Sequence, residues 1–152
     1  MKITLILIVL ILIAFFSFNF LSKSNDSVTS IGSVENIENI IENLMKSTNE
    51  YAYLIIKIQD SEDFIQFTGD AKGVQLDLPL ITERQKELET AFWHVGKDLN
   101  LKVVENKGSN GSRFLDIDLN GNAFEITNIV KIFIEKLFNV NSSTKLVFEY
   151  DI

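Results

Sequence analysis

The strongest constraint on this chain is an almost unbroken apolar run over residues 3–21, interrupted only by Thr4, Ser17 and Asn19. At about 1.5 Å per helical residue, such a run spans roughly 30 Å, which is the hydrocarbon thickness of a bilayer. We therefore predict a transmembrane anchor over residues 1–21, with the rest of the chain tethered to the membrane.

A cleaved signal peptide is the main alternative for this run. Lys2 supplies the positive start of a signal, but the apolar stretch is longer than a typical signal core. Ser22-Lys23-Ser24 is a poor cleavage site, and without cysteine there is no lipoprotein site. A buried core helix is the third option. It is disfavoured because such a helix would show a polar face. An uncleaved single-pass anchor, with the N-terminus inside and the domain extracytoplasmic, fits best.

The polar, Ser-rich segment over residues 22–32 has no periodicity and is predicted to be a flexible linker. Residues 33–152 have the length of one domain. The net charge of −7 disfavours binding to nucleic acid or to anionic lipid headgroups. We therefore expect a neutral, basic or apolar partner.

The pattern after residue 32 alternates between helical and strand-like spacing. A helix is predicted to begin at Ser33, and strands are predicted over 51–58, 63–67 and 73–78, where apolar residues recur at every second position. Thr82 and Gln85 form a capping box for a second helix, which ends near Gly96. Strands over 101–105 and 112–119, a helix over 123–138 capped by Asn122, and a strand over 145–150 complete the pattern.

The predicted fold class is therefore α+β. An antiparallel sheet has helices packed on one face, in the order α-β-β-β-α-β-β-α-β, preceded by the transmembrane helix.

This order, together with the stretches DFIQFTGDAKGVQLDLPL, ELETAFWHVGKDLNLKVVE, GSRFLDIDL and VKIFIEKLFNV, resembles the YbjN-like and type III secretion chaperone-like group of small bacterial domains. The similarity covers residues 51–150. It implies a non-enzymatic domain that binds proteins or peptides across its sheet or helices, with no catalytic residues and no cofactor. The apolar N-terminal run departs from the soluble chaperones of this group.

One motif has the appearance of a metal site. Asp116, Asp118, Asn120 and Gly121 match the first half of an EF-hand loop, but the twelfth position is Thr127, which has no carboxylate. The residues before the motif also alternate like a strand, where an EF-hand has a helix. A strand end, a turn and a helix cap account for the same residues, so we predict no metal.

Among single residues, His94 is the only histidine, and a structural place near a helix end is expected for it. Arg113 is one of two arginines; it either binds a carboxylate of a partner or pairs with Asp116 or Glu105 at the surface. The chain has none of the common nucleotide-binding or hydrolase motifs.

The predicted function is a membrane-tethered, chaperone-like or immunity-like domain that binds a protein or peptide. The predicted binding residues are aromatic side chains and one arginine: Tyr53, Phe64, Phe67, Trp93 and Arg113, with Tyr51 beside them. Two alternatives stay open. One is an enzyme that uses Asp77 and Asp116 as acid and base, and the other is a structural accessory subunit of an envelope complex.

Overall fold

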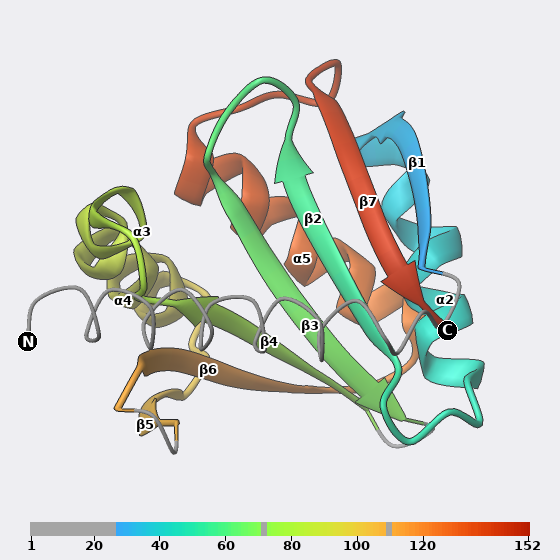
Figure 1. Cartoon of the computed structure of the whole chain (residues 1–152), viewed down its shortest axis with the longest axis horizontal. Helices are drawn as coiled ribbons and strands as arrows, with labels where there is room; N and C mark the ends of the chain where they lie inside the picture. Colours follow the sequence, from blue (N-terminus) through green and yellow to red (C-terminus); the bar gives the residue numbers. More distant parts are fainter. Residues whose placement is uncertain (1–26, 71–72, 109–110) are drawn as a thin grey trace, which may run out of the picture.

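The computed structural model describes residues 27–70, 73–108 and 111–152, and these form one antiparallel sheet with helices beside it (Figure 1). The strands are β1 (Val28–Ser33), β2 (Tyr53–Ile58), β3 (Phe64–Asp70), β4 (Gly73–Pro79), β5 (Val103–Lys107), β6 (Arg113–Asn120) and β7 (Lys145–Asp151). Their order in the sheet is β1-β7-β2-β3-β4-β6-β5. Every neighbouring pair is antiparallel.

The predicted fold was wrong in its number of strands, because the described sheet has seven and the sequence pattern indicated six. The additional strand is β1, most of which falls within the predicted linker over 22–32. It pairs along its whole length with β7, from Val28 opposite Tyr150 to Ser33 opposite Lys145. As an edge strand with an exposed side, β1 has no need of the apolar alternation that identifies an interior strand.

The helices also differ from the prediction. The described elements are a 3-10 turn η1 (Val34–Asn36), α2 (Ile37–Lys46), α3 (Glu83–Glu87), α4 (Glu89–Asp98) and α5 (Ala123–Phe138). The single helix expected after Thr82 is divided at Leu88, whose N–H bonds back to the carbonyls of Gln85 and Lys86 in a tightened turn. The helix over 123–138 has the predicted bounds.

The membrane placement must also be corrected. Within the three described ranges, no helix combines the length and the apolar character that a membrane crossing requires. The most extensively buried of them, α5, has 16 residues, whereas a crossing needs about 20. The predicted anchor over 1–21 lies outside the described residues, so the single-pass, extracytoplasmic arrangement has no support from the structure.

The core lies between the sheet and the helices. Helices α2 and α5 are packed together behind the strands in Figure 1, and α4 lies beside α5 over β5 and β6. Phe92 of α4 meets Phe133 of α5 edge to face, with ring centroids 4.8 Å apart. The strands contribute alternate side chains to this core: Leu54, Ile56, Ile65, Phe67, Val74, Leu76, Leu78, Leu115, Ile117, Leu119, Leu146 and Phe148.

The segment between β6 and α5 is a strand end, a turn and a helix cap, as the sequence indicated. Gly121 has φ 145°, a backbone conformation that side chains with a Cβ rarely adopt. The side chain of Asn122 accepts a hydrogen bond from the N–H of Glu125, and the carboxylate of Glu125 accepts one from the N–H of Asn122. This reciprocal cap fixes the start of α5.

Candidate functional site

The strand residues that alternate with the core positions form the second face of the sheet, which we call the open face. Cross-strand pairing aligns Ile55 with Gln66, and Gln66 with Asp77, which in turn faces Asp116. Most of these side chains are partly exposed. The open face includes Tyr53, Ile55, Lys57, Phe64, Gln66, Thr68, Gln75, Asp77, Phe114, Asp116, Asp118 and Glu149.

A surface cavity of about 380 Å³ lies at one end of the open face. Its apolar lining comes from Ile55 of β2 and Phe64 of β3, and its polar lining comes from Lys57, the β2–β3 turn and Thr82. Lys57 is held in place by Glu149 of β7, with Nζ 2.6 Å from Oε1. The cavity therefore combines an apolar patch with a mixed polar rim, the usual composition of a site for one side chain of a partner.

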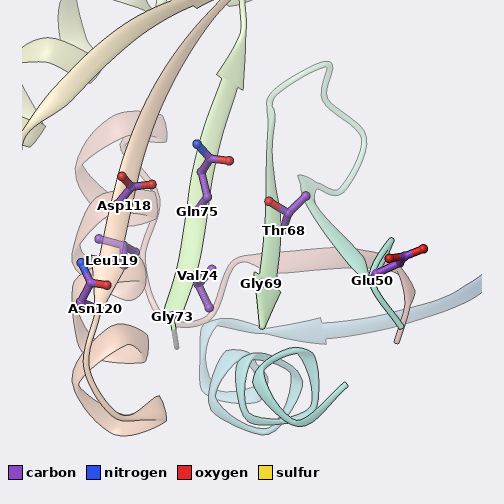
Figure 2. Close-up of a pocket in the computed structure, with 9 residues that line it drawn as sticks. All are labelled: Glu50, Thr68, Gly69, Gly73, Val74, Gln75, Asp118, Leu119 and Asn120. Atoms are coloured by element: carbon purple, nitrogen blue, oxygen red, sulfur yellow. The ribbon is translucent and has the colours of Figure 1, made fainter. Parts of the chain in front are cut away.

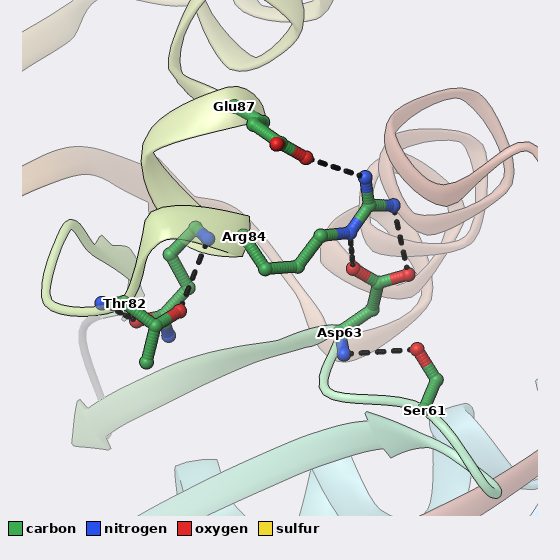
Figure 3. A network of polar contacts seen from close by, with 6 residues as sticks. Ser61, Asp63, Thr82, Arg84 and Glu87 are labelled. Atoms are coloured by element: carbon green, nitrogen blue, oxygen red, sulfur yellow. Dashed lines mark hydrogen bonds and ion pairs between the residues drawn. The ribbon is translucent and has the colours of Figure 1, made fainter.

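The wall of this cavity is fixed by a polar network between the β2–β3 turn and α3 (Figure 3). The guanidinium of Arg84 donates to both carboxylate oxygens of Asp63, with Nε–Oδ1 2.6 Å and Nη2–Oδ2 3.1 Å. Glu87 accepts a weaker bond from Arg84 at 3.3 Å, and Ser61 accepts one from the N–H of Asp63. This bidentate ion pair holds Arg84 and Asp63 in one orientation, so this wall of the cavity is ordered before a partner binds.

Two carboxyl groups face each other across β4 and β6 on the same face. Asp77 and Asp116 are 9 % and 8 % exposed, and each has one buried oxygen without a hydrogen-bond partner in the described residues. The side-chain amide of Asn106 donates to the other oxygen of Asp116. Burial and the neighbouring carboxyl of Asp116 raise the pKa of Asp77 to about 7, because an ionised Asp77 would be both poorly solvated and close to like charge.

This pair is where an acid–base reaction would be sought. Neither side chain lines the cavity at Phe64 or any of three other surface cavities in the described part of the chain. A substrate in one of these cavities would therefore not touch the Asp77 and Asp116 carboxyl groups, although a general acid or base must lie within hydrogen-bond reach of its substrate.

A second, more polar cavity of about 400 Å³ lies at the opposite end of the strands (Figure 2). Gln75 and Asp118 face each other across β4 and β6 on its lining, close to Asn120 and Thr68. Asp118 and Asn120 belong to the EF-hand-like motif, but here they stand on a strand and not on a loop. Within the described ranges, no cluster of three or more acidic, histidine or cysteine side chains is arranged to hold a metal ion.

The structure separates the predicted binding residues. Tyr53 and Phe64 are half-buried on the open face, whereas Phe67, three positions after Phe64 in the same strand, is fully buried in the core. Trp93 lies on α4, away from the open face, and is 40 % exposed. Of the predicted binding residues, Tyr53 and Phe64 therefore lie on the open face.

Arg113 is held by carboxylates of the protein itself. Its guanidinium lies 2.6 Å from Glu89 of α4 and 2.7 Å from Glu105 of β5. Of the two partners suggested by the sequence, Glu105 is found and Asp116 is not, since Asp116 projects from the other face of β6. The bond from Arg113 lowers the pKa of Glu105.

Sequence reasoning missed Ile55 and Thr82, which line the cavity beside Phe64. The period-two pattern contained part of the signal, because Ile55 lies two residues from Tyr53 on the same face of the strand. The position of Thr82 depends on how the chain returns after β4, and local pattern does not specify it.

Together, the fold and the site define an antiparallel-sheet domain with helices over one face and a small apolar cavity on the other. No family model matches the sequence, and comparison with curated proteins and with solved structures gives no significant match. The resemblance to the YbjN-like group therefore stays a prediction from the sequence.

Proposed function

We propose that this protein is a non-enzymatic binding domain that docks a protein or peptide segment on the open face, with one apolar side chain of the partner inserted beside Phe64. The observation that carries the proposal is the cavity of about 380 Å³ lined by Ile55 and Phe64. Its volume leaves room for one large apolar side chain together with neighbouring atoms of the segment, and its wall is pre-ordered by Asp63 and Arg84, which reduces the entropy cost of binding.

Charge supports a basic segment as the occupant. Glu62 lies on the cavity rim and is exposed, and Asp118 is an exposed carboxylate further along the open face. The only cation on the cavity lining, Lys57, is already paired with Glu149. A partner with lysine or arginine on either side of its apolar residue would complement this surface, and the net charge of −7 would speed its approach.

The test is site-specific photocrosslinking of the full-length protein in its native cells, with p-benzoyl-phenylalanine in place of Phe64. The matched control carries the same substitution at Phe124 of α5, which is 62 % exposed and lies outside the open face. We expect a discrete crosslinked protein from position 64 and none from position 124.

A second substitution tests whether the crosslink depends on the apolar lining of the cavity. Adding Ile55→Glu to the crosslinking variant places a charge on the apolar lining and should abolish the crosslinked band, while far-UV circular dichroism stays unchanged. Equal crosslinking from both positions, or no product from position 64, would contradict the proposal.

A further inference from the structure

A third cavity, of about 530 Å³, lies between α4 and the start of β5, on the helix side of the molecule. It brings together the only tryptophan and the only histidine of the chain with two lysines. We call it the α4–β5 cavity. Its lining residues are Trp93, His94, Lys97, Asn100, Leu101, Lys102 and Val103.

The backbone explains why these residues meet. Asn100 has φ 60°, a left-handed conformation that reverses the chain after α4, and the N–H of Leu101 bonds back to the carbonyl of Gly96 at 2.8 Å. A Cβ on Gly96 would come within 2.4 Å of Val103 Cγ2, so glycine lets β5 approach the helix closely. The last turns of α4 form one wall of the cavity, and Leu101 to Val103 form the other.

The charge of this cavity contrasts with that of the whole chain. In the described ranges, Lys97, Lys102, Lys107 and Lys145 have no ion-pair partner, and only Lys97 and Lys102 of these four line the cavity. Lys97 is in the last turn of α4, where a cation suits the helix dipole in any case. Lys102 lies beyond the end of α4, so the helix dipole does not explain why a cation is placed there.

Two properties of the lining define the ligand. Trp93, Leu101 and Val103 offer apolar and aromatic surface for a flat ring, and the two unpaired ammonium groups offer charge for an anionic substituent. A small inorganic anion alone would gain nothing from the apolar wall. A ring is therefore needed together with the charge.

We propose that the α4–β5 cavity binds a small aromatic anion, a ring that carries a carboxylate or phosphate group. The ring lies against Trp93, and the anionic group is held by Lys97 and Lys102. This site is separate from the open face, so the two proposals are tested independently.

The single tryptophan makes the test direct. Phenyl phosphate is titrated into the full-length protein while Trp93 fluorescence is recorded. Two control probes are used: benzyl alcohol, which has a ring but no anionic group, and inorganic phosphate, which has the anionic group but no ring. We expect a saturable change with phenyl phosphate, and binding at least about tenfold weaker with either control, the scale of losing one anchoring contact.

The variant Lys97→Gln/Lys102→Gln should bind phenyl phosphate about tenfold more weakly, because it removes two partly solvated charge contacts. The matched control is Lys107→Gln/Lys145→Gln, which removes two exposed lysines that do not line the cavity. It should bind within about twofold of the unchanged protein.

Ligand-observed NMR of phenyl phosphate gives a second readout that needs no tryptophan signal. The proposal is overturned if neither method detects saturable binding. It is also overturned if benzyl alcohol binds as tightly as phenyl phosphate, or if both lysine double variants bind alike.

Discussion

Asp77 is the residue whose surroundings have the clearest measurable effect. Because its pKa is raised to about 7 in the folded protein and is 3.8 for an ordinary aspartate, the folded state holds a proton that the unfolded state has lost between these values. The stabilisation of the folded state that comes from protonated Asp77 is complete below pH 3.8 and is lost as the pH rises through about 7. The free energy of unfolding should fall by up to roughly 1.4 kcal/mol per pH unit in this window.

We predict that Asp77→Asn removes this decline, since an amide cannot ionise and still can donate a hydrogen bond to Asp116. Urea unfolding between pH 4 and 8 would show the variant equal to the unchanged protein at low pH and more stable at pH 8. Asp118→Asn, on the same face but exposed, removes only the smallest of the effects that raise this pKa, so this comparison variant should keep most of the decline. Parallel pH profiles for Asp77→Asn and the unchanged protein would contradict the assignment.

Phe64 and Phe67 allow a second comparison within one strand. Phe67 is fully buried, so Phe67→Ala should lower the free energy of unfolding by about 3–5 kcal/mol, the usual effect of removing a buried aromatic ring. Phe64→Ala, at the half-buried cavity lining, should lower it by less than half as much. Similar losses in chemical denaturation would mean that the open face is packed as tightly as the core.

At the scale of elements, the contact of α4 with β5 depends on Gly96. Alanine there would favour the helix by about 1 kcal/mol, but its Cβ would overlap Val103, and overpacking costs about 1–3 kcal/mol. We therefore predict that Gly96→Ala destabilises the protein in thermal unfolding.

The compensating variant Gly96→Ala/Val103→Ala should recover part of that loss, because it removes the methyl groups that the new Cβ would meet. The reference is Val103→Ala alone. If the effects of the two substitutions simply add, the two positions are not in contact.

The elements differ in how far the sequence specifies them. The start of α5 was predictable because Asn122 and Glu125 carry a capping signature, and its apolar residues continue to Phe138. Strand β1 was missed because Ser and Gly dominate it and its partner, β7, lies more than a hundred residues away. The break at Leu88 was missed because leucine is a good helix former, and only the packing of α3 and α4 shows the break.

The candidate site likewise has some features that local sequence specifies and others that depend on long-range pairing and packing. Phe64 and Phe67 are an odd number of positions apart and cannot share a face of one strand, so the sequence already contained the information that separates them. The pairing of Asp77 with Asp116 depends on strand register, and the α4–β5 cavity depends on a left-handed residue at position 100. Neither follows from local spacing.

At the scale of the whole molecule, one continuous core joins α2, α4 and α5 to the sheet. We therefore predict a single cooperative unfolding transition for the described part of the chain, with the same midpoint by far-UV circular dichroism and by Trp93 fluorescence. An earlier fluorescence midpoint would show that α4 unfolds separately from the sheet.

The place of β7 in the sheet has a consequence for how the protein is made. This strand comes last among the described elements along the chain, yet it lies between β1 and β2. While the ribosome is still adding residues 145–151, β1 has no neighbour to pair with, and β2 presents one bare edge. Assembly therefore cannot proceed strand by strand in the order of synthesis, and the long-range pairing makes the closing step slow. A nascent chain stalled before β7 would expose these edges to chaperones and to other chains.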